Sequence, residues 1–223
     1  MKKKIVAVTV GQSPRNDIVP ELENICNGRY EFLQSGGLDD LSEQEILDMQ
    51  NNINGEYLIT KNNTGKRVKV PKNIAVNRMK SCFNKGFEQG AEAGIILCTF
   101  ENFNELTSNK VIIKPQKLML NYMKSIAIDK NIGIIYPSAE LIDIAVENWS
   151  KASSNVTVKA YRADEPVEKL LSNVNELILG GAEFIILDCI GYTVEMKEKI
   201  KSICKIPVIL PRTLIISALD ELF

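Results

Sequence analysis

The chain has 223 residues, of which 45% are hydrophobic and 25% charged, a composition typical of a globular protein with one large domain or two small lobes. Its 27 basic and 28 acidic side chains leave a net charge of −1, which excludes the positive field of a protein that binds nucleic acid or anionic membranes. The apolar run before Gly11 is too short for a signal peptide or a membrane-spanning helix. We therefore expect a cytoplasmic protein.

The chain contains no histidine and five cysteines. The absence of histidine excludes Ser-His-Asp and Cys-His catalysis and argues against a zinc site. The cysteines do not form CxxC pairs, and we expect free thiols in a reducing compartment. No glycine run has the spacing of a dinucleotide-binding or phosphate-binding loop. The sequence therefore predicts neither a metal nor an organic cofactor.

The chain opens with a strand and a loop suited to an anion. The β-branched run Ile5–Val10 predicts a buried parallel strand, which Gly11 ends. The loop that follows carries Arg15 and leads into a helix, for which Asn16 or Asp17 is the predicted N-cap. Such a loop points backbone N–H groups above the sheet, so with an arginine it suits a small carboxylate.

The rest of the chain continues to alternate strands and helices, apart from one hairpin. Segments 57–60 and 66–70 flank a short Asn/Gly loop and predict an antiparallel hairpin, an insertion near 57–70 on the edge of the first lobe. The other predicted strands cover residues 30–34, 94–98, 111–113, 132–136, 156–161, 184–189 and 208–210. The other predicted helices cover residues 43–50 with Ser42 as N-cap, 71–89, 118–126, 139–150, 167–179, 194–204 and 213–222. This alternation implies an α/β protein with parallel sheets flanked by helices.

Two segments of the chain resemble each other. In both, a turn leads into an Ile-Ile-Leu strand, which Cys98 follows in the first copy and Asp188 and Cys189 follow in the second. The repetition favours two similar lobes, residues 1–114 plus 211–223 and residues 115–210, with an active-site cleft between them. Ligands of such sheets bind beyond the carboxyl ends of the strands, where both cysteines fall. Either cysteine alone would equally suit core packing.

Two thiols that face one cleft can perform a definite reaction. A thiol pKa near 8.5 can be tuned downward, so that one cysteine is a thiolate base while the other remains an acid. A carbon-bound proton can then be removed on one face of a substrate and returned on the other. This is racemisation without a cofactor.

The chain resembles the aspartate/glutamate racemase superfamily and, more specifically, the AroM family within it. The resemblance rests on residues 11–15 (Gly-Gln-Ser-Pro-Arg), 35–38 (Ser-Gly-Gly-Leu), 97–99 (Leu-Cys-Thr) and 187–192 (Leu-Asp-Cys-Ile-Gly-Tyr). It implies that Cys98 and Cys189 are the two catalytic thiols and that Thr99, with the adjacent backbone N–H, holds a substrate carboxylate. Gln12 and Ser13 would match polar residues of the first loop.

The chain also departs from the racemase pattern. Racemases follow the second cysteine with Thr-His, whereas Ile190-Gly191-Tyr192-Thr193 follows it here. Asp188 could orient a polar substrate group, or it could raise the thiol pKa of Cys189. Arg212, after the last strand, is a further candidate for ligand binding. The predicted substrate-binding residues are Gly11, Gln12, Ser13, Arg15, Thr99, Asp188, Gly191, Tyr192 and Thr193.

The sequence thus indicates a cofactor-independent racemase-like or isomerase-like enzyme that acts on a small carboxylate, an amino acid or a dicarboxylate, by two-cysteine α-proton transfer. Two alternatives remain open. One is a non-catalytic binding or regulatory protein for a small carboxylate, and the other is a single-cysteine decarboxylase or cis–trans isomerase. The expected partner is the small molecule, with no nucleic acid and no membrane, and the resemblance is compatible with a homodimer.

Overall fold

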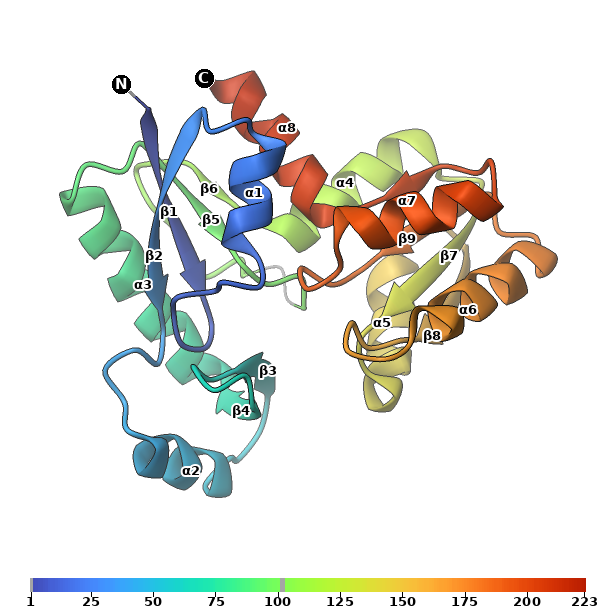
Figure 1. The fold of residues 1–223 in the computed structure, drawn as a ribbon. Coiled ribbons are helices and arrows are strands. Elements are labelled where there is room, and N and C mark those ends of the chain that lie inside the picture. The colour runs from blue at the N-terminus through green and yellow to red at the C-terminus, as the bar shows by residue number, and fades with distance from the viewer. Residues whose placement is uncertain (1, 101–102) are drawn as a thin grey trace. The chain divides into compact units, whose positions relative to one another are not determined.

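The structure, a computed structural model, describes residues 2–100 and 103–223. The chain divides into two compact units, Met1–Lys114 and Pro115–Phe223. Each unit contains a four-stranded parallel sheet flanked by helices (Figure 1). The predicted α/β fold with two parallel sheets is confirmed. The assignment of residues 211–223 to the first lobe, and a cleft between the lobes, stay predictions.

The sheet of the first unit is organised around a buried strand. Its strand order is β2-β1-β5-β6, with bounds β1 (Lys3–Thr9), β2 (Tyr30–Gly36), β5 (Ala93–Ile96) and β6 (Ile112–Ile113). Residues 5–9 of β1 are all buried, as their apolar run predicts. Helix α1 (Val19–Ile25) packs on β2, and α3 (Lys72–Glu88) packs on β1 and β2. Because β1 and β5 are neighbours, the loops that follow them begin at one edge of the sheet.

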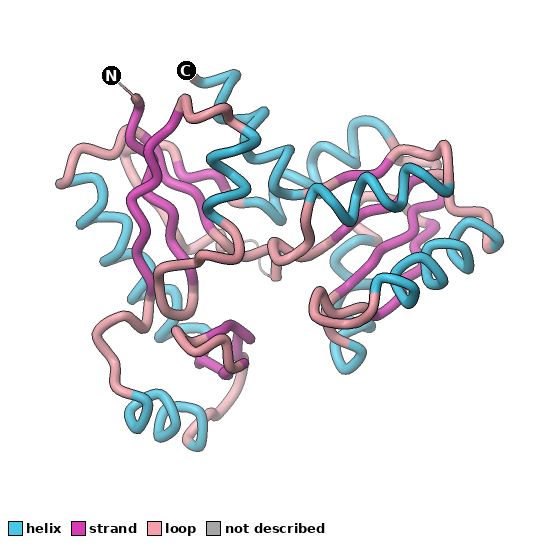
Figure 2. Tube along the Cα trace, in the orientation of Figure 1, coloured by secondary structure: helices cyan, strands magenta, loops and turns pink. Residues whose placement is uncertain are grey.

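The predicted hairpin forms a separate two-stranded sheet in the first unit. Its strands β3 (Tyr57–Lys61) and β4 (Arg67–Pro71) pair antiparallel, apart from the strands of the main sheet (Figure 2). Helix α2 (Glu43–Asn51) packs against β4, and Ser42 is its N-cap, as predicted; Glu45 completes a reciprocal capping box. The insertion therefore consists of a hairpin and the helix that covers it.

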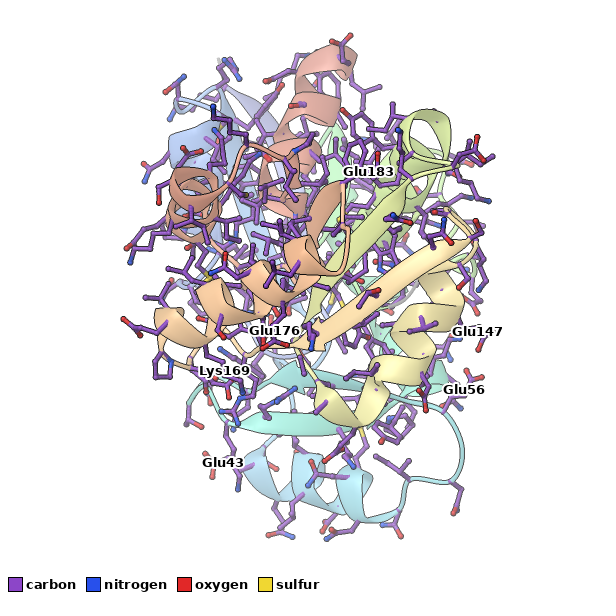
Figure 3. All side chains as sticks on the ribbon, turned by 90° about the vertical axis from the view of Figure 1, so that its right-hand side faces the viewer. Glu43, Glu56, Glu147, Lys169, Glu176 and Glu183 are labelled. Carbon is purple, nitrogen blue, oxygen red and sulfur yellow. The ribbon has the colours of Figure 1, made fainter. Side chains whose placement is uncertain are left out.

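The second unit repeats the parallel arrangement. Its strand order is β10-β9-β7-β8, with bounds β7 (Asn131–Tyr136), β8 (Asn155–Ala160), β9 (Phe184–Leu187) and β10 (Val208–Ile209). Its helices are α4 (Pro115–Ile126), a short 3-10 turn (Ala139–Leu141), α5 (Ile142–Trp149), α6 (Val167–Leu179), α7 (Val194–Ile203) and α8 (Pro211–Leu222). Helix α6 buries Leu170, Val174 and Leu177, whereas Lys169 and Glu176 are exposed (Figure 3). This division of apolar and charged faces is typical of a helix that covers a sheet.

Two helix starts differ from the predictions. Ile18, not Asn16 or Asp17, is the N-cap of α1, and its side chain makes no capping hydrogen bond. The Asp17 carboxylate instead accepts hydrogen bonds from Arg15. Helix α8 begins at Pro211, two residues before the predicted start, because proline fits the first helical position. Every helix in the described ranges is too short or too polar to span a lipid bilayer.

Candidate active site

The two cysteines occupy equivalent positions in the two sheets. Cys98 lies two residues beyond the end of β5, and Cys189 lies two residues beyond the end of β9. Both strands are inner strands of their sheets. The Sγ of Cys98 accepts a hydrogen bond from the backbone N–H of Phe100 at 3.4 Å, and that of Cys189 accepts one from Gly191 at 3.3 Å. A backbone donor at sulfur favours the negatively charged form, so both thiols have one feature that a proton-transferring cysteine needs.

Arg15 is fixed at the carboxyl edge of the first sheet. The residue is 8% exposed, and its Nε and Nη2 donate to the two carboxylate oxygens of Asp17, both at 2.8 Å. Its Nη1 donates to Thr9 Oγ1, the last residue of β1, at 3.1 Å. Lys61 Nζ lies 3.8 Å from the same Asp17 carboxylate. At this edge two cations, Arg15 and Lys61, therefore lie beside the carboxylate of Asp17.

The charges around Asp17 decide its ionisation. Partial burial would raise the pKa of the Asp17 carboxyl, but the hydrogen bond and charge of Arg15, together with the charge of Lys61, hold the pKa below its ordinary value. Asp17 is therefore ionised at neutral pH. It binds the Arg15 guanidinium as a carboxylate does, through two parallel hydrogen bonds.

Gln12 fastens the hairpin to the loop after β1. Its backbone N–H donates to the carbonyl of Lys61 at 3.2 Å, and its Oε1 accepts from the N–H of Asn63 at 3.0 Å. Its Nε2 donates to the carbonyl of Leu41 at 3.3 Å. A Cβ on Gly11 would lie 2.0 Å from the Lys61 carbonyl oxygen, so glycine is required for this close approach. The predicted loop residues thus hold the hairpin tip over the edge of the sheet.

Ser13 closes the same loop from the other side. Its backbone N–H and its hydroxyl donate to the Asp39 carboxylate at 2.6 and 2.7 Å, and the N–H of Gly36 donates to that carboxylate at 2.7 Å. The contacts of Ser13 and Gly36 with Asp39 join the loops that follow β1 and β2. Thr99, next to Cys98, is buried. Of the first-unit residues predicted from sequence, Gly11, Gln12, Ser13, Arg15, Cys98 and Thr99 all lie on loops at this edge.

The loop of Cys189 in the second unit is anchored by buried polar groups. Asp188 is 1% exposed, and its Oδ2 accepts a hydrogen bond from the indole Nε1 of Trp149 at 2.7 Å. Its backbone N–H donates to Ile135 at 2.9 Å, which continues the pairing of β9 with β7. Arg212, also 1% exposed, donates from Nε to the carbonyl of Ile190 at 2.8 Å. Arg212 therefore holds the backbone beside the thiol.

The aromatic and capping residues after Cys189 make internal contacts. The Tyr192 ring stacks on Tyr161 with centroids 5.9 Å apart, and its hydroxyl donates to the Tyr161 carbonyl. Burial, and then the negative charges of Cys189 and Asp188, raise the pKa of Tyr192 well above its ordinary value. Thr193 caps α7 by accepting from the N–H of Met196 at 3.2 Å. Tyr192 and Thr193 thus support the loop through their side chains, and substrate binding by them stays a prediction.

Several residues at these two edges were not predicted from the sequence. In the first unit they include Thr9, Lys61 and Asn63, and in the second Trp149. The Asn/Gly loop of the hairpin predicted a turn but carried no signal for what the turn would contact. Trp149 lies on a helix distant in sequence from Cys189. Among the described residues, no group of three Cys, Asp or Glu side chains is arranged to hold a metal ion.

Comparisons with known proteins connect these observations to a family. A family model described as AroM protein matches residues 5–223. Among solved structures, an allantoin racemase from Klebsiella pneumoniae aligns with a TM-score of 0.64 and 13% identity over 99% of this chain and 87% of that one. The maleate isomerase Iso from Pseudomonas putida S16 aligns with a TM-score of 0.66 and 11% identity over 99% and 94%.

A glutamate racemase from Aquifex pyrophilus aligns with a TM-score of 0.56 and 12% identity over 99% of this chain and 84% of that one. No curated protein is significantly similar in sequence. At these identities the structural matches show a fold shared with these two racemases and the isomerase.

Proposed function

The chain belongs to the AroM family and shares its fold with solved racemases and an isomerase, and from this premise we propose that it is a racemase-like or isomerase-like enzyme that needs no cofactor. Its substrate is a small carboxylate, an amino acid or a dicarboxylate. Its reaction is transfer of the proton on the α-carbon, with Cys98 and Cys189 as the two acid/base groups.

One observation carries the proposal, the equivalent construction around the two cysteines. Each thiol lies two residues past an inner parallel strand and accepts the backbone N–H two residues further on. Cys26, Cys82 and Cys204 lie on or directly after helices instead, and their sulfurs donate to backbone carbonyls. A backbone N–H that donates to a cysteine sulfur stabilises the thiolate form of that cysteine.

The proposed reaction moves one proton in and one proton out. The thiolate of one cysteine takes the α-proton and becomes a thiol, and the electron pair stays on the substrate carbon next to the carboxylate. The thiol of the other cysteine gives its proton to the opposite face of that carbon and becomes a thiolate. Two bases are needed because a single group cannot reach both faces of the carbon.

The first unit supports binding of the carboxylate. Arg15 and Lys61 are cations at the carboxyl edge of the first sheet, and a substrate carboxylate would bind Arg15 by replacing Asp17 at its Nε and Nη2. We expect Arg15→Gln to raise KM more than it lowers kcat, since the guanidinium contributes binding and not proton transfer.

The test is proton NMR in heavy water with a panel of amino acids, hydroxy acids and dicarboxylates. The wild-type protein should exchange the α-proton of one of these compounds for deuterium. Cys98→Ser and Cys189→Ser should each slow turnover by roughly 10²-fold or more, because serine is a far weaker acid and base at neutral pH. Cys204→Ser is the matched control and should retain full activity. Full turnover in both of the first two variants would exclude the two-cysteine mechanism.

The difference in exposure between the two thiols favours one second candidate. Cys98 is buried whereas Cys189 is only partly buried, so a single accessible thiol could act alone. The fold similarity to a maleate isomerase is consistent with cis–trans isomerisation by one cysteine. Isomerisation of a cis-diacid that needs Cys189 but not Cys98 would support this candidate. Binding of carboxylates without any exchange, and without effect of thiol alkylation, would instead indicate a binding protein.

A further inference from the structure

Arg15 is a buried cation that two neighbouring strands hold in place. Its backbone N–H donates to Gln34 Oε1 on β2 at 2.7 Å, and its Nη1 donates to Thr9 Oγ1 at the end of β1 at 3.1 Å. The residue is 8% exposed, and a guanidinium buried to this extent needs an anion beside it, because it has lost most of its hydration. Arg15 is therefore a fixed partner for a carboxylate.

The carboxylate at this position belongs to the chain itself. Asp17 lies in the turn before α1, its side chain is 43% exposed, and its two oxygens accept from Arg15 Nε and Nη2 at 2.8 Å. The carboxylate of a small ligand presents two oxygens with the same spacing, so it can make the same two hydrogen bonds. Asp17 thus occupies, from the solvent side, the place that a ligand carboxylate would take.

Lys61 provides a second cation for the Asp17 carboxylate. Its Nζ lies 3.8 Å from Asp17 Oδ2, the oxygen that also accepts from Arg15 Nη2. A movement of about 1 Å would bring these two atoms to the distance of a charged hydrogen bond. Partial burial would raise the pKa of Asp17, but Arg15 and then Lys61 keep it below its ordinary value, so both cations act on this carboxylate. Asp17 would therefore keep a counter-charge after leaving Arg15.

We propose that Asp17 occupies the carboxylate site of Arg15 in the unliganded protein and that Lys61 receives its carboxylate when the carboxylate of a ligand takes its place. For the identity of the ligand, a small-carboxylate substrate, this inference rests on the proposed function. A neutral group such as an amide does not replace Asp17, because the buried guanidinium would lose its anion. Asp17 and Lys61 are then specificity-determining residues that restrict the substrate to carboxylates.

The test is binding of acetate, malonate and succinate, each compared with its neutral amide at constant ionic strength. Binding is followed by the proton–nitrogen NMR resonance of Arg15 Nε, which Arg15→Gln identifies by its absence. In the wild-type protein at least one carboxylate should shift this resonance to saturation. The amides should leave it in place, since they carry no charge to exchange for that of Asp17.

Asp17→Asn removes the internal competitor and nearly keeps the volume of the side chain. We expect the dissociation constant of the bound carboxylate to fall roughly 5-fold, because the site no longer has to be vacated before the ligand binds. Glu23→Gln is the matched control. It removes an exposed carboxylate on α1, changes the net charge by the same amount and should leave the dissociation constant unchanged.

Lys61→Gln removes the cation that receives Asp17. It should raise the dissociation constant roughly 2- to 3-fold, whereas Lys66→Gln, an exposed position on the same hairpin, should not change it. In the Asp17→Asn background Lys61→Gln should have no further effect, because Lys61 acts through Asp17. A double-mutant cycle of the two substitutions therefore separates this role from direct contact of Lys61 with the ligand.

Unchanged or weaker carboxylate binding in Asp17→Asn would overturn the inference, since Asp17 would then hold Arg15 for the ligand or take no part in binding. Amides that bind as tightly as carboxylates, or no shift with any carboxylate, would overturn it as well. Circular dichroism checks that each variant folds, and Lys61→Gln with its control decides if Asp17→Asn does not. The titration needs no turnover, so its result is distinguishable from success or failure of the α-proton exchange experiment.

Discussion

Paired polar contacts hold individual residues of the loop after β1 in the first unit. Arg15 and Asp17 form a two-bond ion pair only two residues apart, and Ser13 and Asp39 form another two-bond contact. Such contacts hold the loop in a defined conformation, which a site for a small ligand needs. The Arg15–Asp17 contact also makes the loop sensitive to pH, because the pKa of the Asp17 carboxyl is lowered in the folded protein.

The Asp17 carboxyl provides a test of this sensitivity at the residue scale. Its pKa in the folded protein is below the ordinary value of 3.8, so its contribution to stability is present above that value and is lost as the pH falls through the folded-state pKa. Its side chain is 43% exposed, and we expect Asp17→Asn to lower the free energy of unfolding at pH 7 by no more than about 1 kcal/mol.

Urea unfolding of the wild type and Asp17→Asn at pH 7 and at pH 3 measures this effect. The difference between the two proteins should narrow between pH 7 and pH 3, because on acidification the Asp17 carboxyl of the unfolded chain takes up its proton before that of the folded protein. Lys61→Gln, which removes the more distant partner at 3.8 Å, should cost less than Asp17→Asn. A difference that grows on acidification would contradict the assignment.

At the scale of elements, the hairpin shares the apolar core of the first unit through Leu58, Val68 and Val70, and polar contacts fasten its tip to the loop after β1. The tip of β3 meets the loop after β1 through Gln12 and through the space left by the absent side chain of Gly11. The close approach of the hairpin tip to this loop thus requires glycine at position 11. The hairpin also places Lys61 near Asp17, so the position of this lysine depends on the approach of the hairpin to Gly11.

Gly11→Ala tests this dependence. The added Cβ would lie 2.0 Å from the Lys61 carbonyl oxygen and must displace backbone on one side or the other. We expect a loss of about 1–3 kcal/mol in the free energy of unfolding, measured with urea. Lys66→Ala, an exposed position on the same hairpin, should change the free energy of unfolding by less than about 0.5 kcal/mol. Equal stabilities of the two variants would mean that the loop can move away without cost.

At the scale of the whole molecule, the two units repeat one design. Each has a four-stranded parallel sheet and a cysteine two residues past an inner strand. A reaction that needs both thiols would make the units interdependent in catalysis, although each has a hydrophobic cluster of its own. Catalytic groups that act as one unit show strongly non-additive mutational effects.

The double variant Cys98→Ser/Cys189→Ser tests this interdependence. It should be no slower than the slower single variant, because loss of either group already stops the two-base reaction. The rate of α-proton exchange in heavy water is the measurement, with each protein checked for folding by circular dichroism. Multiplicative effects of the two substitutions would show that the thiols act independently.

The sequence by itself determined the fold class and the position of both cysteines. Buried parallel strands read as continuous apolar runs, so residues 5–9 and the Ile-Ile-Leu segments were visible without any tertiary contact. The capping box at Ser42 was equally local, since its partners are three residues apart. Such features depend on neighbours along the chain, and a sequence displays those neighbours.

Only the tertiary structure decided which groups the candidate residues meet. Asp188 gains its indole donor from a residue 39 positions away, and Gln12 gains the hairpin from one 51 positions away. The predicted N-cap at Asn16 or Asp17 was wrong for a local reason, since the Asp17 carboxylate binds the guanidinium of Arg15 and Ile18 is the N-cap. Long-range partners are set by how elements pack, and that packing is a property of the whole unit and not of any segment.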